Sequence, residues 1–95
     1  MYPGQTTRLT ESLVASSTSI SPVTDLVNLS GSTAIETISP PYIGFSGVMI
    51  LVPKDGTLGL LTTGNILVAV TMPQNRATVL VWSDLYSAWA PGAIS

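Results

Sequence analysis

The sequence contains neither cysteine nor histidine. Without cysteine, neither disulfides nor thiolate metal sites can stabilise a small core. Without histidine, the commonest general base and a common zinc ligand are also missing. Five carboxylates remain, and they stand singly along the chain: Glu11, Asp25, Glu36, Asp55 and Asp84. A glycosidase-like acid pair needs two such groups within about 5–10 Å. We therefore predict no catalytic residues, no metal site and no cofactor.

Charge is scarce as well. Charged residues make up 8% of the 95 residues, whereas hydrophobic residues make up 45%. The three basic residues, Arg8, Lys54 and Arg76, lie far apart and the net charge is −2, which argues against nucleic acid as a partner. Soluble monomers usually carry about 25% charged residues. A surface with so few charges predicts a subunit that is largely covered by other protein. The alternative is a monomer whose surface consists mostly of Ser and Thr.

Long hydrophobic runs are also absent. The most apolar window, residues 48–72, is interrupted at 53–56 and again at 62–65 by turn-forming residues. It therefore falls short of the roughly 18–20 residues that a membrane span needs. The opening MYPGQTTRL lacks a basic segment followed by an apolar one, as a secretory signal would have. We expect synthesis in a cytoplasm-like compartment and no membrane partner.

Residues 1–22 have the composition of an arm. They are rich in Thr and Ser, and their apolar residues are scattered. Alone, such a stretch buries too little to offset an ordering cost of about 1–2 kcal/mol per residue. We predict an N-terminal arm that is ordered against a neighbouring subunit or a capsid, or alternatively a short helix over residues 10–16. The expected contact residues are Arg8, Leu9, Leu13, Val14 and Ile20.

Residues 23–95 are predicted to form one β-domain. Short runs rich in Val, Ile, Leu and Thr, separated by turn residues, favour strands. These runs cover residues 24–31, 33–38, 47–52, 58–63, 66–72 and 77–82. Several of them, such as VMILV and TVLVW, are apolar at successive positions, which predicts burial of both faces. We expect a mainly β fold, either a compact sandwich or a barrel-like domain, completed by subunit contact; a closed monomeric barrel is the alternative.

The segment VLVWSDLYSAWAPG contains both tryptophans. A strand over 79–82, a turn over 83–86 and a returning strand over 87–90 would form a hairpin. Trp82 and Trp89 would then be cross-strand or diagonal neighbours, a contact that adds about 0.2–1 kcal/mol. We assign Trp82, Asp84 and Trp89 to this structural hairpin, with Asp84 as a turn former. A carbohydrate-stacking platform is the alternative.

The order of motifs between residues 33 and 91 resembles a β-rich module found in structural proteins of tailed bacteriophages. A Thr/Ile strand with prolines, a Gly-aromatic-x-Gly entry, an Asp-Gly turn, a Gly-Asn-Ile step and a final Asp turn before Trp follow each other in that order. The matching positions are Ile35, Ile38, Pro40, Gly44, Gly47, Asp55, Gly56, Gly64, Asn65, Ile66, Asp84 and Trp89. Where the module usually has a second Asp-Gly turn, this chain has residues 84–87.

The resemblance implies a virion structural protein that acts as a homotrimer. A short chain with an N-terminal arm is similar in plan to capsid decoration, or cement, proteins. Such proteins bind the major capsid protein on the outer surface of the shell and bridge its subunits. A component of a tail spike, tail fibre or head fibre, which attaches to protein or to host glycan, is the alternative function.

Overall fold

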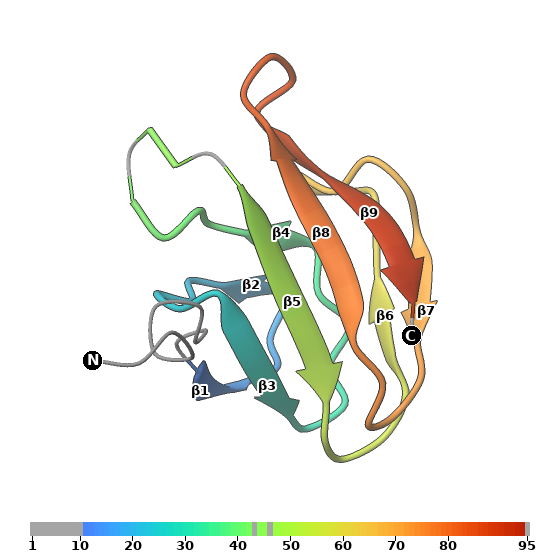
Figure 1. Cartoon of the computed structure of the whole chain (residues 1–95). Coiled ribbons are helices and arrows are strands. Elements are labelled where there is room, and N and C mark those ends of the chain that lie inside the picture. Colours follow the sequence, from blue (N-terminus) through green and yellow to red (C-terminus); the bar gives the residue numbers. More distant parts are fainter. Residues whose placement is uncertain (1–10, 43, 46, 95) are drawn as a thin grey trace, which may run out of the picture.

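The computed structural model describes residues 11–42, 44–45 and 47–94. This part of the chain forms nine strands and contains no helix (Figure 1). The prediction of a mainly β fold is therefore confirmed. Consistent with that content, no helix in the described part could cross a membrane.

Five strands form the largest sheet, in the order β1-β3-β5-β8-β9. They are β1 (Glu11–Ala15), β3 (Leu26–Ser30), β5 (Val48–Pro53), β8 (Thr78–Ser83) and β9 (Ala88–Ile94). The first three pair in parallel, whereas β8 is antiparallel to both β5 and β9. The sheet therefore combines a parallel half with an antiparallel half.

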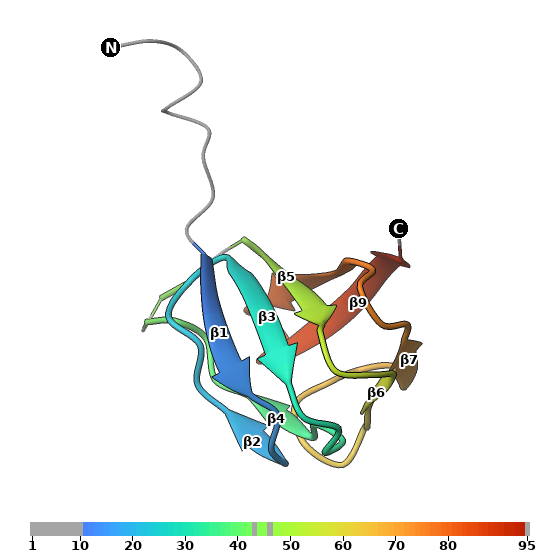
Figure 2. The same cartoon turned by 90° about the horizontal axis from the view of Figure 1, so that it is seen from below.

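Two short strand pairs form a second layer behind this sheet (Figures 1 and 2). Strand β2 (Ser19–Ile20) pairs in parallel with β4 (Thr37–Ile38), and β6 (Leu58–Leu60) is antiparallel to β7 (Val70–Met72). A bridge between Ile35 and Leu60 connects the two pairs, and a second bridge connects Ile66 to Trp89 of β9. The result is a small sandwich that is closed on the β9 side.

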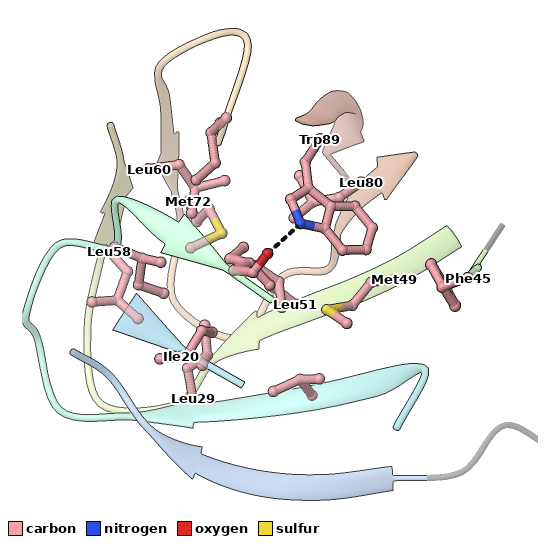
Figure 3. Packing of buried hydrophobic residues seen from close by; sticks show 14 residues of the cluster. Ile20, Leu29, Phe45, Met49, Leu51, Leu58, Leu60, Met72, Leu80 and Trp89 are labelled. Atoms are coloured by element: carbon pink, nitrogen blue, oxygen red, sulfur yellow. Dashed lines mark hydrogen bonds between the residues drawn. The ribbon is translucent and has the colours of Figure 1, made fainter. Parts of the chain in front are cut away.

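The hydrophobic core lies between the two layers (Figure 3). Alternate residues of the large sheet point into it, because successive side chains of a strand face opposite ways. Val27 and Leu29 of β3, and Met49 and Leu51 of β5, are completely buried for this reason. The other core residues are Ile20, Ile35, Ile38, Phe45, Leu58, Leu60, Ile66, Met72, Leu80 and Trp89.

Asn65 ties β4 to the loop between β6 and β7 within the second layer, and Trp89 ties β4 to the large sheet. Its side-chain amide donates to the Ile38 carbonyl at 2.7 Å and its side-chain oxygen accepts from the Ile38 N–H at 2.9 Å. The Trp89 indole N–H donates to the same carbonyl at 2.8 Å (Figure 3). Gly64 allows this close approach, because a Cβ there would overlap the Glu36 carbonyl oxygen.

Residues 11–20, which the sequence assigned to the arm, instead form β1 and β2 within the β-domain. All five residues of β1 pair with β3, and Ile20 is only 4% exposed. A strand at a sheet edge needs few apolar side chains, because its neighbour supplies the hydrogen bonds and the core takes one face. A Ser/Thr-rich segment can therefore be a strand. Residues 11–20 therefore do not form the predicted arm, and residues 11–15 are a strand instead of the alternative helix. Residues 1–10 lie outside the described residues.

Three of the expected strands are much shorter than the sequence indicated, and one of them is 58–63, of which only Leu58–Leu60 form a strand. Of residues 33–38 only Thr37–Ile38 form a strand, and of residues 66–72 only Val70–Met72 do so. Residues 67–69 are exposed although they are apolar. Burial of both strand faces is not found within this single chain either, because the outward residues of the large sheet are only partly covered.

Candidate functional site

The large sheet has an apolar outer face, on the side away from the core. Cross-strand partners share a face, so the register identifies its members. Ile50 pairs with both Leu26 and Val79, and Val48 pairs with Val81. The outer face, as we use the term, consists of Leu13, Leu26, Val48, Ile50, Val52, Val79 and Val81.

This outer face is open to solvent in the single chain. Val48 and Val81 are each 44% exposed and Leu13 is 68% exposed, while the other members are half-buried. The only charged residue in any described strand is Glu11, which accepts a hydrogen bond from the Asn28 side chain at 2.6 Å. An apolar sheet face with so little charge is typical of a surface that binds other protein.

A second exposed apolar surface lies on the opposite flank, between β6 and β7. It consists of Leu61, Leu67 and Val68. The backbone of this loop is fixed against β9, because the Leu67 N–H donates to the Trp89 carbonyl at 2.9 Å and the Trp89 N–H donates to the Asn65 carbonyl at 2.8 Å. We call it the β6–β7 loop surface.

The structure does not gather the predicted contact residues on one surface. Arg8 and Leu9 lie outside the described residues. Leu13 belongs to the outer face, but its neighbour Val14 packs against the core and Ile20 is part of the core. Within the described chain, only Leu13 is placed to contact a partner.

The predicted hairpin residues do lie together. Trp82 stands directly opposite Trp89, with ring centroids 5.0 Å apart and ring planes at 64°. The indole N–H of Trp82 donates to Asp84 Oδ1 at 3.1 Å. Four residues, 84–87, connect the strands, and Ser87 has a positive φ of 50°. Trp89 is fully buried, whereas Trp82 is half-buried.

A pocket of about 360 Å³ adjoins this hairpin. Its lining residues come from the segment between β4 and β5 and from the end of β8: Pro40, Tyr42, Gly44, Phe45, Trp82 and Asp84. We call it the aromatic pocket. Sequence reasoning placed Trp82 and Asp84 in a structural hairpin and Pro40 and Gly44 in strand-end motifs, but it did not bring them together. The sequence feature that could have indicated this pocket is the cluster of Pro, Tyr and Phe in PPYIGF. In the folded chain Pro40, Tyr42 and Phe45 lie beside the hairpin, although they are distant from it in the sequence.

The described part of the chain contains no cluster of three His, Cys, Asp or Glu residues able to hold a metal ion. Its acidic side chains are spread over different loops and one strand end. The features with binding geometry are therefore the outer face, the β6–β7 loop surface and the aromatic pocket.

Comparison with models of known protein families gave no match, and neither curated proteins nor solved structures yielded one. The resemblance to phage structural modules accordingly stays a prediction. Any assignment of function has to be argued from the surfaces described above.

Proposed function

We propose that this protein is a structural subunit of a bacteriophage virion, a capsid decoration protein that associates as a trimer and bridges major capsid subunits. The observation that supports this proposal is the apolar outer face of the large sheet, beside which Glu11 is the one charged residue of the described strands. A face of Leu, Ile and Val side chains next to water is unfavourable, at about 25 cal/mol per Å² of apolar surface. Contact with another protein removes that cost.

The size of the outer face indicates that it cannot be the whole interface. Its members come from four strands, and four strands about 4.8 Å apart and about five residues long, at about 3.3 Å per residue, span only about 300 Å². A stable interface uses about 800 Å² on each partner. The remaining area must come from other surfaces, which in our proposal include the β6–β7 loop surface and residues 1–10.

A trimer also requires two different surfaces on each subunit. In a cyclic trimer each contact joins one surface of a subunit to a different surface of the next, whereas a two-fold dimer joins identical patches. The outer face and the β6–β7 loop surface are two apolar regions on different sides of the domain. We propose that they meet across the trimer interface.

Attachment to the capsid is assigned to the N-terminal side of the domain. Strand β1 is at the edge of the large sheet, and within the described residues only its β3 side is paired. A free strand edge can accept a further strand through main-chain hydrogen bonds, which need no charged side chains. This property fits a chain that has few charges.

The trimer can be tested with a charge placed on the outer face. Val81→Glu puts a carboxylate in the middle of the proposed interface, so light scattering should change from three times the chain mass to the chain mass. Val23→Glu is the matched control, because Val23 is 77% exposed and lies outside the sheet. A monomeric wild-type protein at micromolar concentration, or a trimeric Val81→Glu variant, contradicts the proposed interface.

Capsid attachment can be tested by two truncations and co-sedimentation with capsids that lack this protein. Deletion of residues 2–10 leaves every described strand in place, so the domain should fold while its occupancy on capsids falls strongly. Deletion of residues 2–20 also removes β1, β2 and the buried Ile20, and should therefore reduce stability as well. Full occupancy by the folded shorter truncation moves the attachment surface to the β-domain. Absence of binding by the full chain contradicts the decoration role.

A further inference from the structure

The aromatic pocket is formed by two loops at the same end of the large sheet. The segment between β4 and β5 and the connection between β8 and β9 both project from that end (Figure 1). Tyr42 and Phe45 come from the first loop, and Trp82 and Asp84 from the strand end and turn of the second. Residues distant in the sequence thus form one concave site, which is the usual form of a binding pocket.

The aromatic rings of this pocket are held in place by each other. Tyr42 contacts Phe45 edge to face, with centroids 5.5 Å apart, and Phe45 contacts the buried Trp89 at 5.8 Å. Trp89 in turn contacts Trp82. The Phe45 N–H also donates to the Tyr42 carbonyl at 3.2 Å, which fixes the turn between them. A ligand would therefore meet aromatic walls that are already ordered.

Asp84 gives the pocket its charge. It is the only charged residue in the lining, and the Trp82 indole N–H holds its Oδ1 oxygen. That hydrogen bond fixes the carboxylate beside the indole ring while leaving its negative charge at the pocket. Aromatic faces are electron-rich as well, so the carboxylate and the rings attract the same kind of ligand.

We infer that the aromatic pocket binds the guanidinium group of an arginine side chain on a partner protein. A guanidinium stacks on aromatic faces, is weakly hydrated, and pairs with a carboxylate through a planar array of donors, whereas a lysine ammonium is compact and strongly hydrated. An anion is disfavoured by Asp84. A saccharide requires several polar groups, and the side chains of this lining offer one carboxylate and one phenol.

This inference does not depend on the proposed virion role or on the outer face. The pocket residues differ from those of the outer face and of the β6–β7 loop surface. A protein in any assembly could use such a site to select a partner that presents an exposed arginine. The site therefore has a test of its own.

The probe is Nα-acetyl-arginine amide, titrated into the full chain in its native oligomeric state while the Trp82 indole N–H resonance is followed by NMR. Nα-acetyl-citrulline amide is the matched neutral probe, since it has nearly the same shape but no positive charge. We expect saturable shifts at millimolar arginine probe, weakened by added salt, and little response to the citrulline probe. Equal response to both probes, no response to either, or saturable binding of a methyl glycoside instead overturns the inference.

Two pairs of variants locate the binding. Tyr42→Ala removes a lining ring that is 63% exposed and should weaken binding of the arginine probe. Tyr86→Ala removes a 69% exposed ring outside the lining and should leave binding unchanged. Asp84→Asn keeps an acceptor for the Trp82 indole but removes the charge, and should weaken binding about two- to fivefold, as expected for an exposed ion pair. Asp55→Asn, at the other end of β5, is its control. Unchanged binding in both Tyr42→Ala and Asp84→Asn contradicts the site.

Discussion

The two faces of the large sheet share the same apolar residue types but have opposite surroundings. On the inner face Val27, Met49 and Leu80 are completely buried by the second layer. On the outer face Val48 and Val81 are each 44% exposed to solvent. The same apolar residue types thus stabilise the fold on one face and remain available for association on the other.

This difference between the two faces explains why the strand sequences do not alternate between apolar and polar residues. When one face of a sheet is exposed to solvent, its strands normally alternate apolar and polar residues, as in most antiparallel sheets. Here the outward positions are apolar too, so a run such as VMILV looks like a strand buried on both sides. Substitutions on the inner face should therefore alter the free energy of unfolding, whereas those on the outer face should alter association.

The largest effect is expected where the inner face is most tightly packed, at Trp89. Trp89→Ala removes a fully buried ring and its hydrogen bond to Ile38, and should lower the free energy of unfolding by about 3–5 kcal/mol. Trp82→Ala, at the half-buried partner, should cost about half as much. Urea unfolding followed by far-ultraviolet circular dichroism measures both. Equal losses would show that the two rings share one environment.

A smaller loss is expected when the Asn65 link between β4 and the β6–β7 loop is removed. Asn65→Ala deprives the Ile38 N–H of its side-chain acceptor, and should cost about 1–3 kcal/mol. Gln74→Ala is a suitable control, because its side-chain amide donates to the Lys54 carbonyl on the exposed surface. That variant should stay within about 0.5 kcal/mol of wild type. An unchanged free energy of unfolding in Asn65→Ala would mean that the core alone holds β4 and the β6–β7 loop together.

The smallest effects compare neighbours on β1 that point to opposite faces. Val14→Ala loses core contacts and should cost about 1 kcal/mol, whereas Leu13→Ala should change stability by less than about 0.5 kcal/mol. Both should be measured in the Val81→Glu background, so that association does not contribute to stability. If Leu13→Ala lowers the free energy of unfolding more than Val14→Ala does in that background, Leu13 and not Val14 faces the core.

The centres of the longer strands were predictable because short runs of β-branched and aliphatic residues end at turn residues. The runs 24–31, 47–52 and 77–82 contain or overlap β3, β5 and β8 within a few residues. β1 and β2 were missed because the short apolar run 13–15 and the single Ile20 stand in a stretch rich in Ser and Thr. Their burial depends on β3 and β4, which are distant in the sequence, and no local pattern contains that information.

The candidate surfaces were only partly predictable for the same reason. The hairpin that pairs Trp82 with Trp89 is local, and its sequence was sufficient. The aromatic pocket was not, because it needs Tyr42 and Phe45 beside a hairpin some forty residues away. Low charge led to the prediction of association, which stays a prediction. The sequence also grouped Leu13, Val14 and Ile20 as contact residues, although Leu13 and Val14 are adjacent on β1 and therefore face opposite ways.

The strand order of the large sheet has a consequence for how the chain folds. Its β8–β9 pair is joined by a short loop, whereas β1 with β3, β3 with β5 and β5 with β8 are each separated by other elements. Closing a short loop loses less entropy than closing a long one, so the hairpin is expected to form first and to serve as the template on which β5, β3 and β1 add. During synthesis this hairpin leaves the ribosome after the strands it organises. The Ser and Thr residues around β1 and β2 are expected to keep this N-terminal segment soluble until the strands with which it pairs have formed.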